Sequence, residues 1–327
     1  MSDGEAPGRS GGRRSLRTDL GGGLVLPTPV LVAAGCVGTG RELGGLVDLR
    51  RVGGLVSRTI TLEPRKGSPP PRIAETPSGT VWSTGFQNPG VAVFVEVELP
   101  RLARGGAPVI VSIAGGSVDE HVRLVGALQT RPEVAAIEVN LSGPDEEMRR
   151  EVLGEHVDRT GEVVGAIARM SLVPVFAKLP MAASALPDLA RAAVRAGAHG
   201  VTMGAPPAAL GVRTNDLRPA LGGVTGWLAG PALKPLTLRA VFETSRVVPE
   251  APILAVGGVR SASDAIEMLL AGASAVQVGT AMLVDPMAPV EIARGIADYL
   301  RDKGISSPAD LQARLRVPAG FRATDAP

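Results

Sequence analysis

The chain has 327 residues, a formal net charge of +2 and 45% hydrophobic residues, but only 2% aromatic residues. The high apolar fraction and near-zero net charge exclude a disordered protein. The single cysteine, Cys36, excludes an internal disulfide framework and a cysteine-rich metal or iron–sulfur site. The three histidines are far apart in the sequence and form no metal-ligand motif, so no metal site is predicted.

The sequence shows no signal for membrane insertion or nucleic-acid binding. No apolar run reaches the roughly 18 residues that span a membrane. The Arg-rich N-terminal segment lacks the apolar stretch of a signal peptide. No basic patch is interleaved with aromatic residues, as a nucleic-acid site would require. We therefore expect a cytoplasmic protein that binds a small molecule, with an N-terminal tail (residues 1–18), one barrel domain (residues 19–310) and a C-terminal tail (residues 311–327).

Short β-branched runs alternate along the chain with Ala- and Leu-rich segments of helical period, which is typical of repeated βα units and a parallel sheet. Eight strands are predicted, in chain order, at Pro29–Ala33, Gly54–Arg58, Val109–Ile113, Ala136–Asn140, Pro174–Lys178, Gly200–Met203, Pro252–Val256 and Ala275–Val278. Eight such strands predict an α/β fold closed into a (β/α)8, or TIM, barrel, whose reactive loops follow the C-terminal strand ends. An open doubly wound sheet is the alternative, but no strand ending in a suitably placed acidic residue follows the glycines of "AAGCVGTG".

Two long insertions interrupt this rhythm. Residues 61–100 follow the second predicted strand, and residues 204–231 follow the sixth. Both leave from the reactive end of the predicted barrel, and long loops there often cover active sites. We therefore expect both insertions to act as active-site lids.

The last two predicted strands end in glycines, in "ILAVGGV" and "AVQVGTA". At this place in a barrel, backbone N–H groups can bind a phosphate, so Gly257, Gly258, Gly279 and Thr280 are candidate phosphate ligands. The alternative is that the glycines only turn the chain. Lys178 ends the apolar run "PVFAKLP". A lysine there is costly unless it meets an anion or an electron-rich partner, the alternative being a surface position on a loop.

The segments "TITLEPRKGSPPPRIAETPSG", "GFQNPG", "LAGPALKP" and "LAGASAVQVGTA" resemble the dihydroorotate dehydrogenase family, class 1, and its B subgroup in particular. The resemblance runs from about residue 19 to residue 296. It implies a TIM barrel that binds FMN at its C-terminal mouth and moves a hydride between flavin and substrate. It also implies a homodimer and an electron-transfer partner subunit, which carries FAD and an iron–sulfur cluster in the B subgroup.

Carried over residue by residue, the resemblance implies a set of FMN contacts. Lys178 matches a lysine at the N1–C2=O edge of the flavin, where it would stabilise the anionic reduced ring. The full set of implied cofactor-binding residues is Ala33, Ala34, Gly35, Thr59, Ser112, Asn140, Lys178, Gly230, Gly257, Gly258, Gly279 and Thr280.

The sequence departs from the family at the catalytic base. The family's loop after the fourth strand carries a cysteine that removes the substrate proton, and "NLSGPDEE" has Gly143 at that position. Glycine cannot accept a proton, so Asp145 and, more weakly, Ser142 are the candidate bases. Arg58 replaces a lysine that contacts flavin and substrate, and it is the candidate partner for an anionic substrate group.

The residues expected to contact the substrate also differ from those of the family. Trp82 and Ala205 stand where the family has asparagines that hold orotate, and Ser112 replaces another asparagine, whereas Asn140 is retained. The candidate pocket residues are Trp82, Ser83, Gly85, Phe86, Asn140 and Ala205. These changes predict an FMN-dependent oxidoreductase that desaturates a C–C bond, or reduces an alkene, in a small non-orotate substrate. The alternatives are a genuine dihydroorotate dehydrogenase of pyrimidine biosynthesis and a catalytically silent flavin-binding paralogue. We also expect the scarce aromatic residues to gather at the barrel mouth rather than in the core.

Overall fold

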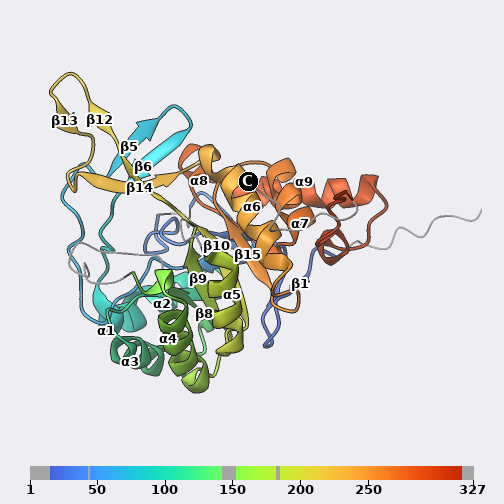
Figure 1. Cartoon of the computed structure of the whole chain (residues 1–327), viewed down its shortest axis with the longest axis horizontal. Helices are drawn as coiled ribbons and strands as arrows, with labels where there is room; N and C mark the ends of the chain where they lie inside the picture. Colours follow the sequence, from blue (N-terminus) through green and yellow to red (C-terminus); the bar gives the residue numbers. More distant parts are fainter. Residues whose placement is uncertain (1–14, 43–44, 142–151, 182–184, 319–327) are drawn as a thin grey trace, which may run out of the picture.

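A computed structural model describes residues 15–42, 45–141, 152–181 and 185–318 (Figure 1). Its centre is a closed barrel of eight parallel strands in chain order, and the last strand pairs with the first. These strands are β3 (Val30–Val32), β4 (Gly54–Val56), β7 (Val109–Ile113), β8 (Val134–Asn140), β9 (Val175–Pro180), β10 (Gly200–Ala205), β15 (Ile253–Val256) and β16 (Ala275–Val278). The predicted TIM barrel is confirmed, and each predicted strand is present with ends shifted by a few residues.

Helices surround the barrel on the outside (Figure 1). The longer ones are α3 (Val118–Leu128), α4 (Val157–Met170), α5 (Leu186–Arg195), α6 (Lys234–Ser245), α7 (Ala262–Ala271) and α9 (Ala288–Asp302). Shorter helical segments are η1 (Leu49–Arg51), α1 (Gly90–Val93), the π-helix η2 (Phe94–Glu98), α2 (Leu99–Ala103), η4 (Leu153–Glu155), η5 (Pro231–Leu233), α8 (Ala281–Val284) and η6 (Pro308–Leu311). The starts of α3 and α7 have side-chain caps, because Ser117 and Ser261 accept hydrogen bonds from backbone N–H groups three residues on.

The barrel interior changes character along its axis. Alternate residues of each strand point inward. Near the N-terminal strand ends these positions are apolar, as in Leu31, Ile110 and Phe176, and the β1–β2 hairpin (Thr18–Asp19 and Val25–Leu26) packs its leucines against them. Two residues further along β9, the same face carries Lys178. The C-terminal half of the interior is therefore the polar half.

The expectation that the aromatic residues gather at the mouth is wrong for two phenylalanines. Phe94 and Phe176 are both 0% exposed and belong to the two hydrophobic clusters. Phe176 fills the apolar floor of the barrel, and Phe94 packs in the layer between strands and helices. In a core built mainly of Val, Leu and Ala side chains, these two rings fill the space that smaller side chains would leave empty.

The two insertions meet in a second sheet beside the barrel (Figure 1). The first insertion provides β5 (Ile73–Thr76) and β6 (Gly79–Trp82), and the second provides β11 (Ala208–Leu210) and β14 (Thr225–Ala229). They form a four-stranded antiparallel sheet in the order β11-β14-β6-β5, and β12 (Val212–Arg213) and β13 (Arg218–Pro219) form a projecting hairpin. The pairing of β6 with β14 joins the insertions into one unit. A lid function for this unit stays a prediction.

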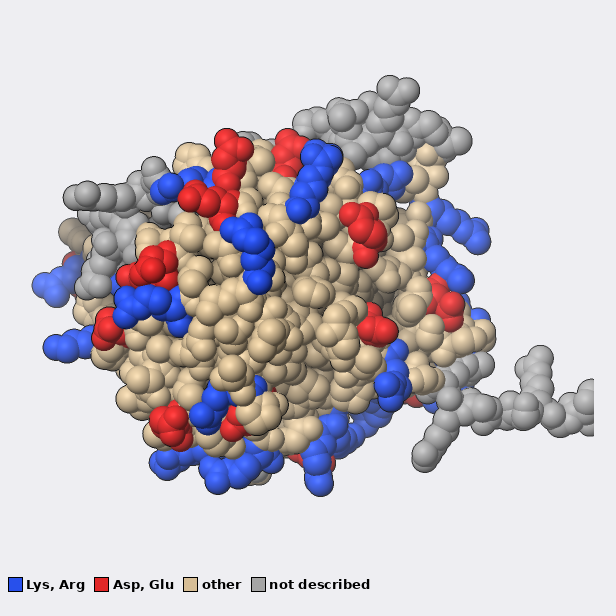
Figure 2. Space-filling model, turned by 90° about the horizontal axis from the view of Figure 1, so that it is seen from below, with Lys and Arg blue, Asp and Glu red and all other residues tan. Residues whose placement is uncertain are grey.

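Charged side chains are mixed on the surface. Figure 2 shows basic and acidic groups interspersed around a broad uncharged area. Several are ion pairs one helical turn apart, such as Arg191–Asp188 at 2.6 Å and Arg301–Asp298 at 2.7 Å. Among the described residues, no helix combines the length and apolar character needed to cross a membrane.

Candidate active site

The predicted cofactor residues lie at or just beyond the C-terminal ends of the barrel strands, except Gly230, which follows β14 of the insertion sheet. Ala33–Gly35 follow β3, Thr59 follows β4, and Gly257–Gly258 and Gly279–Thr280 follow β15 and β16. Because all eight strands are parallel, these ends meet at one mouth of the barrel. The fold therefore gathers residues from distant parts of the sequence at a single site. Ser142 and Asp145, the candidate bases, lie outside the described residues.

Three polar side chains connect neighbouring strands at this mouth. Thr59 Oγ1 lies 3.1 Å from Ser112 Oγ and accepts a hydrogen bond of 3.1 Å from Asn140 Nδ2. Ser112 is fully buried, whereas Asn140 is half-buried at the end of β8. The predicted residues Thr59, Ser112 and Asn140 thus form one hydrogen-bonded group across β4, β7 and β8.

Arg58 has a carboxylate neighbour that the sequence did not reveal. Its Nε lies 3.7 Å from Glu98 Oε2, and the Glu98 side chain is largely buried. Burial raises the pKa of Glu98, and the Glu42 carboxylate raises it further, while Arg58 opposes this shift. Glu98 is the last residue of the π-helix η2, and π-helical turns are frequent at functional sites. The predicted anion-binding arginine therefore has a protein carboxylate nearby, at ion-pair distance but without a hydrogen bond between Nε and Oε2.

The glycines after β15 are needed for close packing. Gly258 has φ +79°, and a Cβ there would lie 2.4 Å from the backbone N of Lys234, the first residue of α6. Gly257 has φ +126°, and a Cβ there would lie 2.6 Å from Thr237 Oγ1. The turn is thus pressed against the junction of η5 and α6, where the Lys234 N–H donates to the Pro231 carbonyl and Pro235 has no N–H. The close contact with this junction explains why both positions are glycines.

The glycine after β16 lies against the loop after β3. A Cβ on Gly279 would lie 3.4 Å from Ala33 Cβ and 3.6 Å from Cys36 Sγ. Gly230, from the second insertion, has φ +106° and approaches the backbone of Gly79 on the first insertion. Gly230 therefore allows the two insertions to approach each other closely, and Gly279 places the backbone after β16 next to Ala33 and Cys36 on the loop after β3.

Lys178 points into the barrel and is 7% exposed. Its Nζ lies 3.4 Å from Glu138 Oε1, which sequence reasoning missed. A signal was present, because Glu138 stands within the apolar strand "AIEVN" two residues before Asn140 and so shares its inward face. A buried ammonium with one carboxylate partner fits the electron-rich edge of a flavin, so the residues of the mouth fit FMN.

The predicted substrate-pocket residues lie mainly in the first insertion. Trp82 on β6 is the register partner of Trp227 on β14, and both rings are half-buried. Ser83 Oγ lies 2.9 Å from Ser68 Oγ, and Phe86 has the left-handed φ of +51°. Gly85 (φ +61°) lies between them in this turn, whereas Ala205 is fully buried at the end of β10. The pairing of the chain's two tryptophans was not predicted.

Asn88 fastens this insertion to the barrel. Its Oδ1 accepts from the N–H groups of Thr61 at 3.3 Å and Gly90 at 2.8 Å. Its Nδ2 donates to Thr61 Oγ1 at 2.8 Å and to the Phe86 carbonyl at 2.7 Å. The motif "GFQNPG" therefore has a structural reason for its asparagine, since one buried amide holds both the turn and the chain leaving β4.

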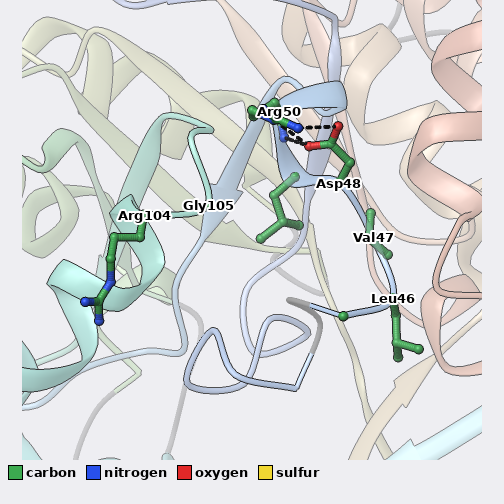
Figure 3. A pocket seen from close by; sticks show the side chains of 8 residues that line it. Leu46, Val47, Asp48, Arg50, Arg104 and Gly105 are labelled. Atoms are coloured by element: carbon green, nitrogen blue, oxygen red, sulfur yellow. Dashed lines mark hydrogen bonds and ion pairs between the residues drawn. The ribbon is translucent and has the colours of Figure 1, made fainter.

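An open depression of about 480 Å³ lies elsewhere (Figure 3). Its lining includes Leu46, Arg104 and the Asp48–Arg50 ion pair of 2.9 Å. Its residues directly precede β4 and β7, so it opens at the N-terminal end of the barrel. That end serves stability rather than catalysis in this fold. We therefore do not assign the active site to it.

A parallel (β/α)8 barrel with polar and glycine-rich strand ends at one mouth defines an α/β-barrel enzyme. The dihydroorotate dehydrogenase family model matches residues 16–300. The chain therefore belongs to the dihydroorotate dehydrogenase family, whose members are oxidoreductases acting on CH–CH groups and generally bind FMN.

Individual relatives agree with this family. A protein of Desulforudis audaxviator named "Dihydroorotate dehydrogenase B (NAD(+)), catalytic subunit" is 44% identical over 283 residues, covering 86% of this chain and 92% of the relative. A protein of Pelobacter propionicus with the same name is 39% identical over 293 residues, covering 90% and 96%. The crystal structure of DHODH in complex with ferulenol from Eimeria tenella superposes with a TM-score of 0.75 at 21% identity, covering 91% of this chain and 88% of that one. This last similarity shows the shared fold.

Proposed function

We propose that the chain is the FMN-binding catalytic subunit of a B-type dihydroorotate dehydrogenase, which oxidises dihydroorotate to orotate. The observation that carries the proposal is 44% identity to a relative of that name over 86% of the chain. The hydrogen-bonded mouth residues and the glycine turns support it. The comparisons favour this reading over the remodelled substrate that the sequence departures predict.

In this proposal FMN, when bound, accepts the hydride from the substrate. Gly230, Gly257, Gly258, Gly279 and Thr280 would hold its phosphate, and Ala33, Ala34 and Gly35 would contact its ring. Lys178 places a positive charge at the ring edge where negative charge develops on reduction. Thr59, Ser112 and Asn140 bind the ring and the substrate.

Oxidation of dihydroorotate also requires a base that removes a proton from the substrate. Arg58, with Glu98 nearby, orients the substrate carboxylate. Ser142 or Asp145 removes the proton, because Gly143 has no side chain to do so. Losing a positioned base lowers a rate by about two to four orders of magnitude, so the replacement base decides whether the reaction is efficient.

A remodelled pocket for another small planar substrate is the second candidate. It rests on Trp82, Ala205 and Gly143, which replace two substrate-binding asparagines and the base. Each lost hydrogen bond costs about 0.5–1.5 kcal/mol. The lost asparagines together would weaken dihydroorotate binding by about one to three orders of magnitude. Trp82 also fills space that an asparagine leaves open.

We also propose an electron-transfer partner subunit that passes electrons to NAD⁺, since the named relatives are catalytic subunits of NAD(+) enzymes. The chain's one cysteine cannot hold an iron–sulfur cluster, so such a cluster would belong to the partner. A homodimer and a cytoplasmic location follow from the same family membership.

The test is anaerobic reduction of the FMN-loaded protein by dihydroorotate, followed by flavin absorbance. Bleaching within seconds supports dihydroorotate oxidation. Intact FMN that dihydroorotate does not bleach supports the second candidate or a silent paralogue. Gly143→Cys with Trp82→Asn separates those two, because restored bleaching shows a competent flavin with an altered pocket. Protein that does not bind FMN at all refutes the proposal.

A further inference from the structure

Four polar side chains meet inside the barrel beneath the proposed flavin. Glu138, Lys178, Thr202 and Gln277 come from β8, β9, β10 and β16. Glu138, Thr202 and Gln277 are 0% exposed, and Lys178 is 7% exposed. Inward positions of a barrel are normally filled by aliphatic side chains, so a polar layer at this depth needs its own explanation.

Glu138 is the centre of this group. Its Oε1 lies 3.4 Å from Lys178 Nζ, and its Oε2 accepts from Thr202 Oγ1 at 3.0 Å and Gln277 Nε2 at 2.9 Å. An isolated carboxylate buried in this way would be strongly destabilising. Three donors, one of them cationic, make the ionised form acceptable.

The Glu138 carboxylate determines how the Gln277 side-chain amide is oriented. The amide gives its N–H to Glu138, while its Oε1 is buried without a hydrogen-bond partner among the described residues. Turning the amide over would place two oxygens against each other. The unsatisfied oxygen costs about 1–3 kcal/mol, so this orientation is retained for the sake of Glu138.

Lys178 also influences the loop after β3. Its charge lowers the pKa of the Cys36 thiol on that loop. Cys36 Sγ in turn lies 3.6 Å from the position of a Cβ on Gly279. The ammonium that Glu138 contacts therefore acts on the loop that is proposed to contact the flavin ring.

We propose that Glu138 is a positioning residue for the reaction. It fixes the Lys178 ammonium beneath the flavin edge and offsets part of its charge, and it thereby limits how strongly the site stabilises the anionic reduced flavin. This inference rests on the proposed function, because it requires FMN at this mouth. Thr202 and Gln277 hold the carboxylate in place and carry no charge themselves.

The test compares Glu138→Gln with Thr202→Val in FMN-loaded protein. Glu138→Gln keeps the shape and removes the charge that offsets Lys178. At a fixed potential set by a redox dye, we expect its ratio of reduced to oxidised flavin to rise at least tenfold, about 30 mV for a two-electron couple. Thr202→Val removes one donor to the carboxylate without changing any charge, and Lys178 keeps Glu138 as its partner, so its ratio should change much less than that of Glu138→Gln.

A second readout needs no flavin. In apoprotein, Glu138→Gln exposes Cys36 to the full charge of Lys178, so alkylation of the thiol at pH 9 should become several-fold faster. Glu138→Asp keeps the charge one methylene further away and should give intermediate values in both assays. If Glu138→Gln does not fold, Glu138→Asp takes its place as the test variant.

The outcomes are distinct. Wild type that binds FMN, with a flavin ratio unchanged in folded Glu138→Gln or Glu138→Asp, overturns the role of Glu138 and leaves the proposed function standing. An equal shift in Thr202→Val also overturns it, because the effect would then be structural. Wild type that binds no FMN overturns the proposed function and this inference together.

Discussion

Gly258 offers a direct test of the turn proposed to hold the phosphate. In Gly258→Ala, the new methyl group would lie 2.4 Å from Lys234 N and 2.6 Å from Lys234 Cα. These are backbone atoms at the start of α6, so no side-chain rotation can relieve the contact. The residue would also have to keep φ +79°, which is unfavourable for any residue with a Cβ.

The two effects add. Left-handed backbone costs about 1–2 kcal/mol, and forcing extra atoms into a packed site costs about 1–3 kcal/mol. We expect Gly258→Ala to lose about 2–5 kcal/mol of unfolding free energy, and with it roughly 3–7 °C of Tm. The matched control is Gly304→Ala. Gly304 has φ +68° but nothing within 4 Å of its Cβ position, so only the backbone effect remains.

Two measurements check this prediction, thermal unfolding by circular dichroism and the FMN content of the purified protein. We expect Gly258→Ala to lose both Tm and flavin, and Gly304→Ala to lose only about 1–3 °C of Tm while keeping its flavin. Equal Tm values in the two variants, with full flavin in both, would refute the close approach of this turn to α6.

Three further predictions concern buried polar groups. Burial raises the pKa of Cys36 to about 11, and the charge of Lys178 opposes this shift. The rate at which iodoacetamide alkylates Cys36 should therefore still be rising at pH 10. A rate that reaches its plateau near pH 8.5 would contradict this prediction. Asn88→Ala removes the four hydrogen bonds of a buried amide and should lower the unfolding free energy by about 2–4 kcal/mol in urea, whereas a change below about 0.5 kcal/mol would show that the bonds do not matter. Burial lowers the pKa of His121, although its bond to the Ser117 carbonyl and the Glu120 carboxylate oppose the shift. The contribution of neutral His121 to the unfolding free energy is therefore complete above pH 6.5, the ordinary pKa of the group, and declines as the pH falls below it. Urea midpoints should therefore drop between pH 7 and pH 5 in wild type, and less in His121→Gln.

The barrel was predictable because its signal is local and repeated. Many strands are short β-branched runs such as "VIVSI" (residues 109–113), and strands such as β7, β8, β9 and β15 are followed by helices of 10 to 14 residues. The reactive end then follows from topology alone. The glycine turns after β15 and β16 were predictable for the same reason, since they mark where two apolar runs stop.

The partners of the functional side chains were harder to predict. Glu98 meets Arg58 only because a π-helical turn after α1 rotates it toward the barrel, and no propensity scale gives that turn. Glu138 meets Gln277 across the barrel interior, a contact set by closure of the sheet rather than by spacing in the chain. Phe176 was misjudged because an aromatic residue in a strand fits a wide barrel floor as well as a pocket.

The pairing of β6 with β14 affects how the sequence of this protein can evolve. Trp82 and Trp227 belong to insertions far apart in the gene, yet each is the other's neighbour across the strands. A substitution at one alters the surroundings of the other, while the glycine turns that follow β15 and β16 stay untouched. If the insertion sheet lines the substrate pocket, as we propose, substrate preference would change through coupled substitutions in this sheet while the eight-stranded barrel is conserved.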